Sequence, residues 1–578
     1  MSHRDLPNRL SADQLDLHRR RSAAAEFYRV HRVPELLETV LDQMFQLQPA
    51  DLHGYLAEHF LQLSSPPRIS RLRGTEVFDA AGRLSVQAHV SCIVCNNEKR
   101  MSSAAVSSCV AGQETSGDRR RVDHVRTAVQ WINGPLSDLL RGQNPCDQSD
   151  VDRKLRAFFR AGLEEQEELR NLKRPDSGSP EQPDTLPPSP PSTLRTSKRS
   201  ADRGKKINPS EKPVPPAEPA EPELCGSTAI GSVSLAVLKT GATVKSIPLY
   251  RHIAALKNSD PPARFQVPVC LVPLLRCGKT SPGKLSLLKE VLLIPTGGQR
   301  VREIITMTLE LQKEVMRIMN TSTKAGAAQV VVREAGAPAA SLERPEQPLD
   351  VIAEACSGLG LAPGTHFRLA LNCAAPELMD YAKGKYEVCT GVLKTPEELV
   401  DLYQSLLSRY PAVASLIDPF RREDSDQWEK LNSTMGNSCS LIADMTYKLQ
   451  APPPPGARGF VLKHCNQTTV SDLIQITTEQ PGSVLMGITC DEPCSDASWS
   501  DMVVGLGLDY VSLGGLSGAE RICKYNRLMA IEEELAEQGI LVSRQGLRPP
   551  LFPENPEEQL VSAEPSVCDG EQNAAGAV

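Results

Sequence analysis

The sequence predicts an α/β protein with a (β/α)8-type barrel, preceded by an α+β capping domain and a short N-terminal helical hairpin. Between about 266 and 516, short apolar runs alternate with amphipathic stretches, which is typical of parallel strands covered by helices. The number of these units fits a barrel of roughly 250 residues. Ahead of them, residues 69–160 alternate like strands, and residues 34–63 carry apolar side chains at helical spacing.

Composition sets the broad class of protein. The chain has 578 residues, 40% of them hydrophobic, with 46 prolines and a net charge of −7. This length allows two or three domains, and the charge gives no reason to expect nucleic-acid binding. No apolar run approaches the roughly 18 residues of a membrane span. The start lacks an apolar signal segment, and 16 cysteines are scattered through strand-like runs, so we expect a cytoplasmic protein with reduced thiols.

The N-terminal segment, residues 1–66, is expected to be a helical hairpin. Pro34 opens one apolar pattern, and a second follows the break at Pro49. Two such short helices cannot bury enough surface alone, so we expect a homodimer. The pattern resembles the RII-alpha or DPY-30 type of dimerisation-and-docking motif. That resemblance implies a four-helix bundle that grips an amphipathic helix of an anchoring protein at residues 34–63. The alternative is an ordinary hairpin packed on the next domain.

The capping domain is expected at 67–257. Strand alternation is followed by helices near 122–140, 151–163 and 229–242. Within it, residues 174–223 are rich in Pro, Ser, Glu and Lys and predict a disordered insertion, because such a segment cannot build a core. The barrel is expected at 258–546, and a disordered tail at 547–578.

The barrel strands are expected at nine apolar runs, with helices such as 302–319, 396–408 and 468–479 between them. Strands separated by helices indicate parallel pairing, and functional residues of barrels follow the carboxyl ends of their strands. The expected strands are 266–275, 290–294, 329–332, 367–371, 413–418, 440–444, 459–463, 484–489 and 510–513. Their ends carry Glu334, Asn372, Asp418, Asp444, Lys463, Thr489 and Ser512.

Lys463 is the most informative of these residues. It directly follows the apolar run Phe460–Leu462, and a turn-forming segment comes after it. Burying an ammonium group costs desolvation energy. The lysine is therefore expected either to extend to water or to be held at the strand end for proton chemistry.

Several long segments resemble the enolase family. Residues 75–82, 225–237, 248–254 and 524–535 are similar to family motifs in the same order, so the resemblance runs from about 69 to 545. It implies a capping domain in front of a barrel, and dehydration of 2-phosphoglycerate to phosphoenolpyruvate with Mg²⁺ (a glycolytic lyase reaction). Similarity to the sperm-type form of the family implies the sperm flagellum, with a role in energy supply or assembly for motility.

The resemblance also assigns roles to single residues. Val461–Gln467 matches the segment of the catalytic base, with one inserted residue, and makes Lys463 the base. In the same way Glu334 is the catalytic acid and Glu290 is a substrate-contacting glutamate. Ser512 stands at a substrate-binding position where the family has a second lysine.

The metal-binding positions depart from the family pattern. Three ligand positions hold Asn372, Ile417 and Ala111, and an acidic pair of the family motif is replaced by Ala443 and Asp444, which leaves one acid. Magnesium prefers several charged oxygen ligands, so a degraded metal site is expected. A relocated ligand such as Asp418 or Asp491 is the alternative. Two hypotheses follow: a phosphopyruvate hydratase, or a catalytically inactive scaffold anchored through its N-terminal hairpin.

Overall fold

The computed structural model describes residues 12–106, 117–172 and 224–542, apart from 259, 261, 280, 297, 323–330, 333–335, 340, 446–451, 481 and 490–495. The predicted insertion and tail lie outside the described residues, as do Glu334, Ala111 and Asp491. The chain divides into two compact units. One is Met1–Arg68 with Cys92–Lys99, and the other is Ile69–Ser91 with Arg100–Val578.

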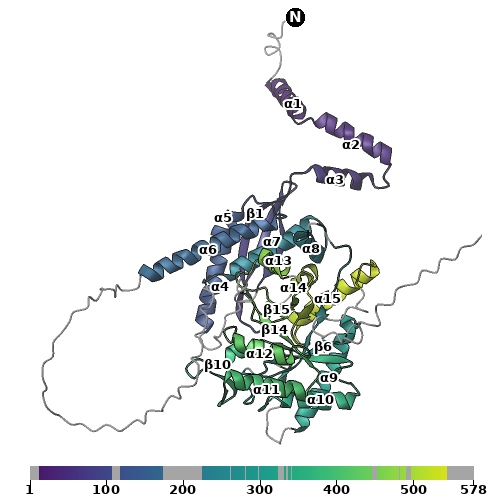
Figure 1. Ribbon diagram of the computed structural model, residues 1–578. Helices are drawn as coiled ribbons and strands as arrows, with labels where there is room; N and C mark the ends of the chain where they lie inside the picture. The colour runs from purple at the N-terminus through teal and green to yellow at the C-terminus, as the bar shows by residue number, and fades with distance from the viewer. Residues whose placement is uncertain are drawn as a thin grey trace, which may run out of the picture. The chain divides into compact units, whose positions relative to one another are not determined.

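The described part of the first unit contains three helices (Figure 1). They are α1 Ala12–Val30, α2 Val33–Leu47 and α3 Leu52–Leu63. Pro34 lies in the first turn of α2, where its missing N–H costs nothing. Asp51 caps α3 by accepting from the backbone N–H of Gly54 at 2.9 Å. The two helices of the predicted hairpin are present, whereas α1 was not predicted because its polar sequence lacks an apolar stripe.

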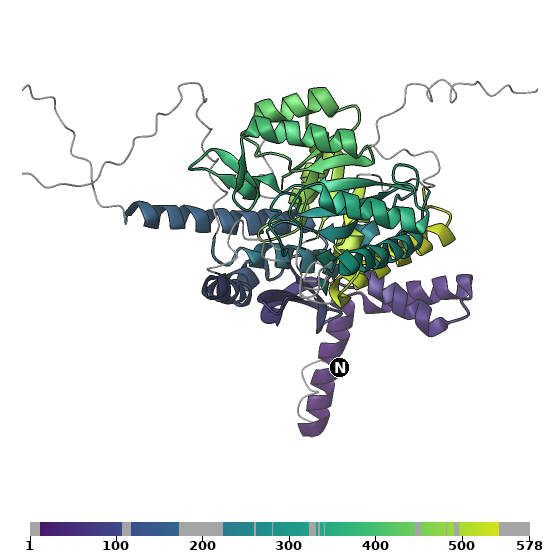
Figure 2. The same ribbon diagram turned by 90° about the horizontal axis from the view of Figure 1, so that it is seen from below.

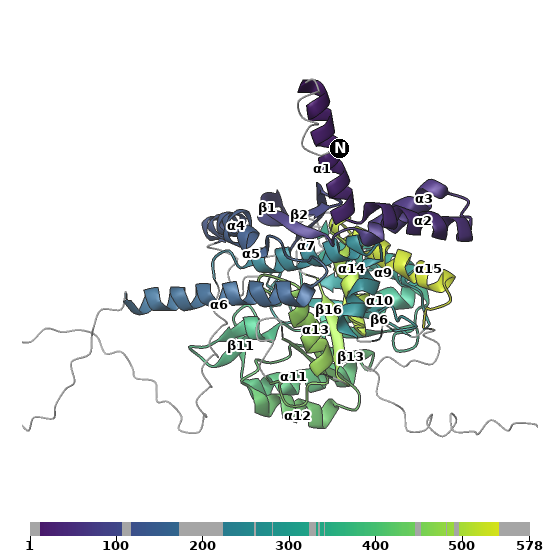
Figure 3. The ribbon, with the colours of Figure 1, turned by 90° about the horizontal axis from the view of Figure 1, so that it is seen from above.

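The capping domain combines a three-stranded sheet with helices. The strands β1 Arg68–Phe78, β2 Leu84–Val94 and β3 Asn97–Ala105 pair in the order β1-β2-β3. The helices are α4 Gly117–Asn133, α5 Pro135–Leu140, α6 Gln148–Leu172, α7 Thr228–Val244 and α8 Leu249–Lys257. Gly134 divides the helix predicted near 122–140 in two. The far end of α6 extends well beyond its neighbours, with Leu172 exposed (Figures 2 and 3).

The large sheet closes into a barrel, as predicted. The strands β4 Val269–Cys270 and β5 Val272–Arg276 are two halves of one run; β4 pairs with the last strand, β17, and β5 with β6. The order around the ring is β4/β5, β6, β9, β13, β14, β15, β16 and β17. Their bounds are β6 Glu290–Pro295, β9 Phe367–Asn372, β13 Val413–Ile417, β14 Ser440–Asp444, β15 Gly459–Leu462, β16 Val484–Ile488 and β17 Tyr510–Ser512.

Helices and short connecting elements accompany the ring. The helices are α9 Val301–Ser322, α10 Gln347–Leu359, α11 Pro396–Arg409, α12 Ser425–Met435, α13 Val470–Glu479, α14 Ser498–Gly505 and α15 Ala519–Glu537. The short elements are β7 Val331–Val332, β8 Pro338–Ala339, η1 Ala375–Leu378, β10 Met379–Asp380, β11 Lys385–Cys389 and β12 Val392–Lys394. Thr395 and Thr469 begin α11 and α13 with capping boxes, which fixes where these helices start.

The expectation of parallel pairing throughout is wrong for one strand. β6 runs antiparallel to both β5 and β9, because a loop without a helix joins β5 to β6. The strand predicted at 329–332 is also not part of the ring. Of its described residues, Val331 and Val332 are extended, and they pair with β8. The helices α9 and α10 therefore both lie between β6 and β9 in the sequence.

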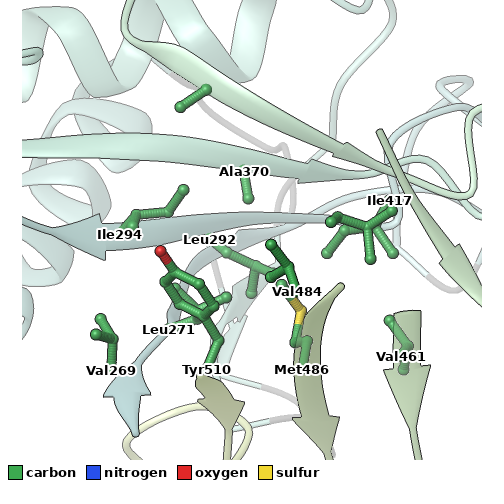
Figure 4. Packing of buried hydrophobic residues seen from close by; sticks show 12 residues of the cluster. Val269, Leu271, Leu292, Ile294, Ala370, Ile417, Val461, Val484, Met486 and Tyr510 are labelled. Atoms are coloured by element: carbon green, nitrogen blue, oxygen red, sulfur yellow. The ribbon is translucent and has the colours of Figure 1, made fainter. Parts of the chain in front are cut away.

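Apolar side chains from all around the ring form one buried cluster (Figure 4). Most are branched aliphatic residues, as is usual in the interior of such barrels. The cluster comprises Val269, Leu271, Leu292, Ile294, Ala370, Ala414, Ile417, Ile442, Val461, Val484, Met486 and Tyr510. Ile417, which stands at a metal position of the enolase motif, is therefore part of the hydrophobic core and is only 1% exposed.

Candidate functional site at the carboxyl ends of the barrel strands

The strand ends bring most of the predicted site residues to one rim. Asn372, Asp444 and Ser512 end β9, β14 and β17, and Lys463 directly follows β15. These strands are parallel, so their carboxyl ends meet at the same face of the barrel. Glu290 reaches this face for the opposite reason: it begins the antiparallel strand β6 and pairs in register with Asn372.

Lys463 makes an ion pair at this rim. Its Nζ lies 2.5 Å from Oδ2 of Asp444, and the two side chains are only 18% and 15% exposed. The backbone N–H of Asp444 donates to Oδ1 of Asp418 at 2.7 Å. Shielding from water strengthens such charge-assisted contacts. The three residues, at the ends of β13, β14 and β15, thus form one connected group of charges.

Asp418 has an unusual environment within this group. Its backbone is left-handed, with φ 49°, and is held by hydrogen bonds from its N–H to the carbonyl of Ile442 and from the N–H of Ala375 to its own carbonyl. Burial of the carboxyl group, followed by the neighbouring charge of Asp444, raises the pKa of Asp418 to about 7. The amide of Asp444 and the ammonium of Lys463 act in the opposite direction. Asp418 can therefore exchange a proton near neutral pH.

A second ion pair lies on the same side of the ring. Nζ of Lys289 is 3.1 Å from Oε1 of Glu377, and Nζ of Lys279 donates to the backbone carbonyl of Glu377 at 2.9 Å. Sequence reasoning missed both partners. Lys289 precedes Glu290 in a matched motif, which was a usable signal, whereas nothing in the sequence marks Glu377.

The described residues at the family's metal positions offer few ligands for magnesium ions. Asn372 is neutral, Ile417 is a core hydrocarbon, and the carboxylate of Asp444 is already bound by an ammonium group. In the described part of the chain, no three His, Cys, Asp or Glu side chains are grouped so that they could hold a metal ion. Magnesium needs near-octahedral coordination by hard oxygen atoms. No chemical step through magnesium can therefore be derived from these residues.

Two helices of the capping domain hold the segment that follows Lys463. The backbone N–H of Gly231 on α7 donates to the carbonyl of Asn466 at 3.1 Å, and a Cβ at Gly231 would lie 2.5 Å from that oxygen. The carboxylate of Asp152 on α6 accepts from the hydroxyl of Ser471 at 2.7 Å and from its backbone N–H at 2.9 Å. Asp152 also accepts from the hydroxyl of Ser234 at 2.7 Å. These contacts fix the loop that carries the lysine.

His464, which follows Lys463, should make the stability of the protein depend on pH. His464 is buried, and burial lowers its pKa to about 4. The neutral ring is favoured in the folded state, so stability is full above the unfolded pKa near 6.5 and is lost as the pH falls towards 4. Between pH 7 and pH 5 the unmodified protein should lose about 2 kcal/mol of its free energy of unfolding through His464, and His464→Asn should not show this loss. Urea unfolding at both pH values measures this, and an unchanged loss would contradict it.

The fold and the rim define a class: an α/β-barrel protein whose lysine and carboxylates gather at the carboxyl ends of the strands. Residues 264–549 match the family model described as "Enolase, C-terminal TIM barrel domain". Enolase 4 of Danio rerio is 44% identical over 566 residues, covering 93% of this chain and 96% of the relative. Enolase 4 of Xenopus laevis is 42% identical, covering 90% and 92%. Enolase 4 of Homo sapiens is 40% identical, covering 91% and 90%. The chain belongs to the enolase family.

No helix in the described ranges is both long and apolar enough to cross a lipid bilayer.

Proposed function

We propose that this enolase-family chain acts mainly through assembly, and that dehydration of 2-phosphoglycerate is strongly reduced in it. The observation that carries this proposal is the ion pair of Lys463 and Asp444 at the rim. It occurs where the family motif calls for acidic metal ligands and where this chain has Asn372, Ile417 and Ala443.

The chemistry of proton abstraction supports a reduced reaction. A lysine must be neutral to accept a proton, and an ammonium group paired with a carboxylate resists losing its own. The enediolate that would form also needs positive charge to stabilise it. Metal ions usually supply several kcal/mol of that stabilisation, and each 1.36 kcal/mol lost is a tenfold loss of rate. Loss of the ligands therefore predicts a decrease of several orders of magnitude.

A coupled assay with purified full-length protein tests this proposal. With 2-phosphoglycerate and Mg²⁺ present, we expect no formation of phosphoenolpyruvate above background, and the same result for Lys463→Ala. An active enolase assayed in parallel controls for the coupling enzymes. Turnover that disappears in Lys463→Ala would overturn the proposal.

The second candidate function is that reaction itself, catalysed by a phosphopyruvate hydratase with Lys463 as base and Glu334 as acid. What favours it is that Lys463, Glu290 and Ser512 share one rim, together with similarity over most of the chain to proteins named Enolase 4. In that case the protein would contribute to glycolysis, and the coupled assay would detect it. For either function we propose the cytoplasm of the sperm flagellum as its place.

The helices α2 and α3 support the assembly role. Val40 is fully buried, but Leu37, Leu41, Phe45 and Leu63 are between 46% and 77% exposed. So much exposed apolar surface is costly in water and is typical of interaction sites. We propose that a second copy covers it in a four-helix bundle, which in turn holds an amphipathic helix of an anchoring protein at residues 34–63.

The double variant Leu37→Asp/Leu41→Asp tests the bundle. We expect light scattering on the full chain to give the mass of a dimer for the unmodified protein and of a monomer for the variant, because charges replace buried contacts. Glu38→Gln, which changes an exposed polar side chain of the same helix, is the matched control and should stay dimeric. A double variant that remains dimeric would show that these helices do not make the dimer. Deleting residues 1–66 should then also leave localisation unchanged.

A further inference from the structure

We propose that the ammonium group of Lys463 is a built-in counter-cation that takes the place of a divalent metal ion at the barrel rim and excludes metal from it. This inference rests on the proposed function, in which the rim holds no magnesium ion. It adds the reason why the remaining acids of the rim do not bind metal.

The first argument is geometric. Asp418, Asp444 and Lys463 follow one another at the ends of three adjacent parallel strands, since β13 pairs with β14 and β14 with β15. The Lys463 Nζ approaches Asp444 Oδ2 to 2.5 Å, which is within the reach of a charge-assisted hydrogen bond. An oxygen atom that accepts at this distance is not open to a cation on the same side.

The second argument concerns the balance of charge. Asn372, Ile417 and Ala443 are uncharged residues at positions where the family motifs carry acids. Fewer negative charges remain to be compensated, and one ammonium group neutralises one carboxylate. The carboxyl group of Asp418, which neighbours this pair, accepts a hydrogen bond from the backbone N–H of Asp444 at 2.7 Å. The rim therefore gains little from a divalent ion, which would first have to shed water.

The Lys289–Glu377 pair extends the same principle. Its nitrogen and oxygen atoms lie 3.1 Å apart, and this acid, too, is neutralised by a lysine of the chain itself. The two pairs are not equivalent, however. The side chains of Lys289 and Glu377 are 37% and 58% exposed, so water screens them, and they contribute less than the shielded pair.

Removing the internal cation should therefore create a metal site. In Lys463→Met the apolar stem is kept but the charge is lost, which leaves Asp418 and Asp444 as neighbouring carboxyl groups without their ammonium. Two carboxylates and water are a minimal set for Ca²⁺ or Mn²⁺ at millimolar concentration. Lys463→Arg keeps a positive charge at the same position and is the matched control.

The test is thermal unfolding of the full-length protein with 10 mM CaCl2 or MnCl2, against NaCl of equal ionic strength. We expect a metal-specific increase in Tm of about 2 °C in Lys463→Met, and none in the unmodified protein or in Lys463→Arg. The double variant Lys463→Met/Asp444→Asn should lose the increase, because one of the two carboxylates is gone.

Two results would overturn the inference. A metal-specific increase in the unmodified protein would show that the ammonium does not exclude metal ions. No increase in a folded Lys463→Met would show that the ammonium is not what stands in for the metal. Failure of the proposed function looks different: it would appear as turnover of 2-phosphoglycerate in the coupled assay, which this experiment does not measure.

Discussion

Replacing Asp424 with alanine is expected to lower the free energy of unfolding by about 3–5 kcal/mol. Its carboxylate binds the guanidinium of Arg421 through two hydrogen bonds of 2.7 and 3.0 Å, and both side chains are almost completely buried. The hydroxyl of Tyr386 donates to the same carboxylate. Without Asp424, the buried guanidinium of Arg421 and the buried hydroxyl group of Tyr386 lose their hydrogen bonds to this carboxylate, and burial makes that loss costly.

Chemical denaturation of Asp424→Ala measures this loss. Glu533→Ala is the control, because Glu533 also pairs with an arginine, Arg302, but both side chains are more than half exposed. Surface pairs contribute about 0–1 kcal/mol, so the control should change little. Equal losses in the two variants would mean that burial does not determine the strength of the pair at Asp424.

Asp152→Ala is expected to destabilise the protein by a similar amount, about 3–5 kcal/mol. The fully buried carboxylate accepts from Gln148, Ser234 and Ser471, which lie on α6, α7 and α13. Its removal takes away the acceptor of the hydroxyl groups of Ser234 and Ser471 and loosens the contact between the capping domain and the barrel. Since Ser471 follows the loop of Lys463, the rim should lose order as well.

Denaturation and hydrogen exchange together measure the effect of Asp152→Ala. We expect lower free energy of unfolding and faster exchange at the amides of the loop that follows Lys463. Glu165→Ala, an exposed position on the same helix, is the control and should stay within about 0.5 kcal/mol of the unmodified protein. Destabilisation without faster exchange in that loop would mean that Asp152 does not hold the rim.

Apolar runs were sufficient to predict most of the barrel. Strands such as β14 and β15 are buried on both faces and therefore read as short continuous apolar segments, and their predicted limits agree with the structure to within one residue. Strand direction was not predictable in this way. A buried strand looks the same in either direction, and the antiparallel course of β6 follows from the helix-free loop before it rather than from its own sequence.

At the site, too, the sequence predicts the positions of residues but not the contacts of their side chains. Position in the sequence was enough to predict that Lys463 and Asp444 follow neighbouring strands, and the motif pointed to Glu290. The ion pair itself depends on side-chain geometry that spacing does not contain. Glu377 and Asp152 had no signal in the sequence, because each acts through contacts with residues far away along the chain. Glu334 and Ala111 lie outside the described residues, and their roles stay predictions.

Calorimetric titration of Mg²⁺ into the full-length protein, with and without 2-phosphoglycerate, tests the central claim most directly. The claim is that the rim is neutralised by its own lysine and has no magnesium site. We predict no saturable binding heat in either titration up to 10 mM Mg²⁺, a range in which sites of millimolar affinity would be detected. Saturable binding near one or two ions per chain, strengthened by 2-phosphoglycerate, would contradict the claim and would make this protein a magnesium-dependent enolase.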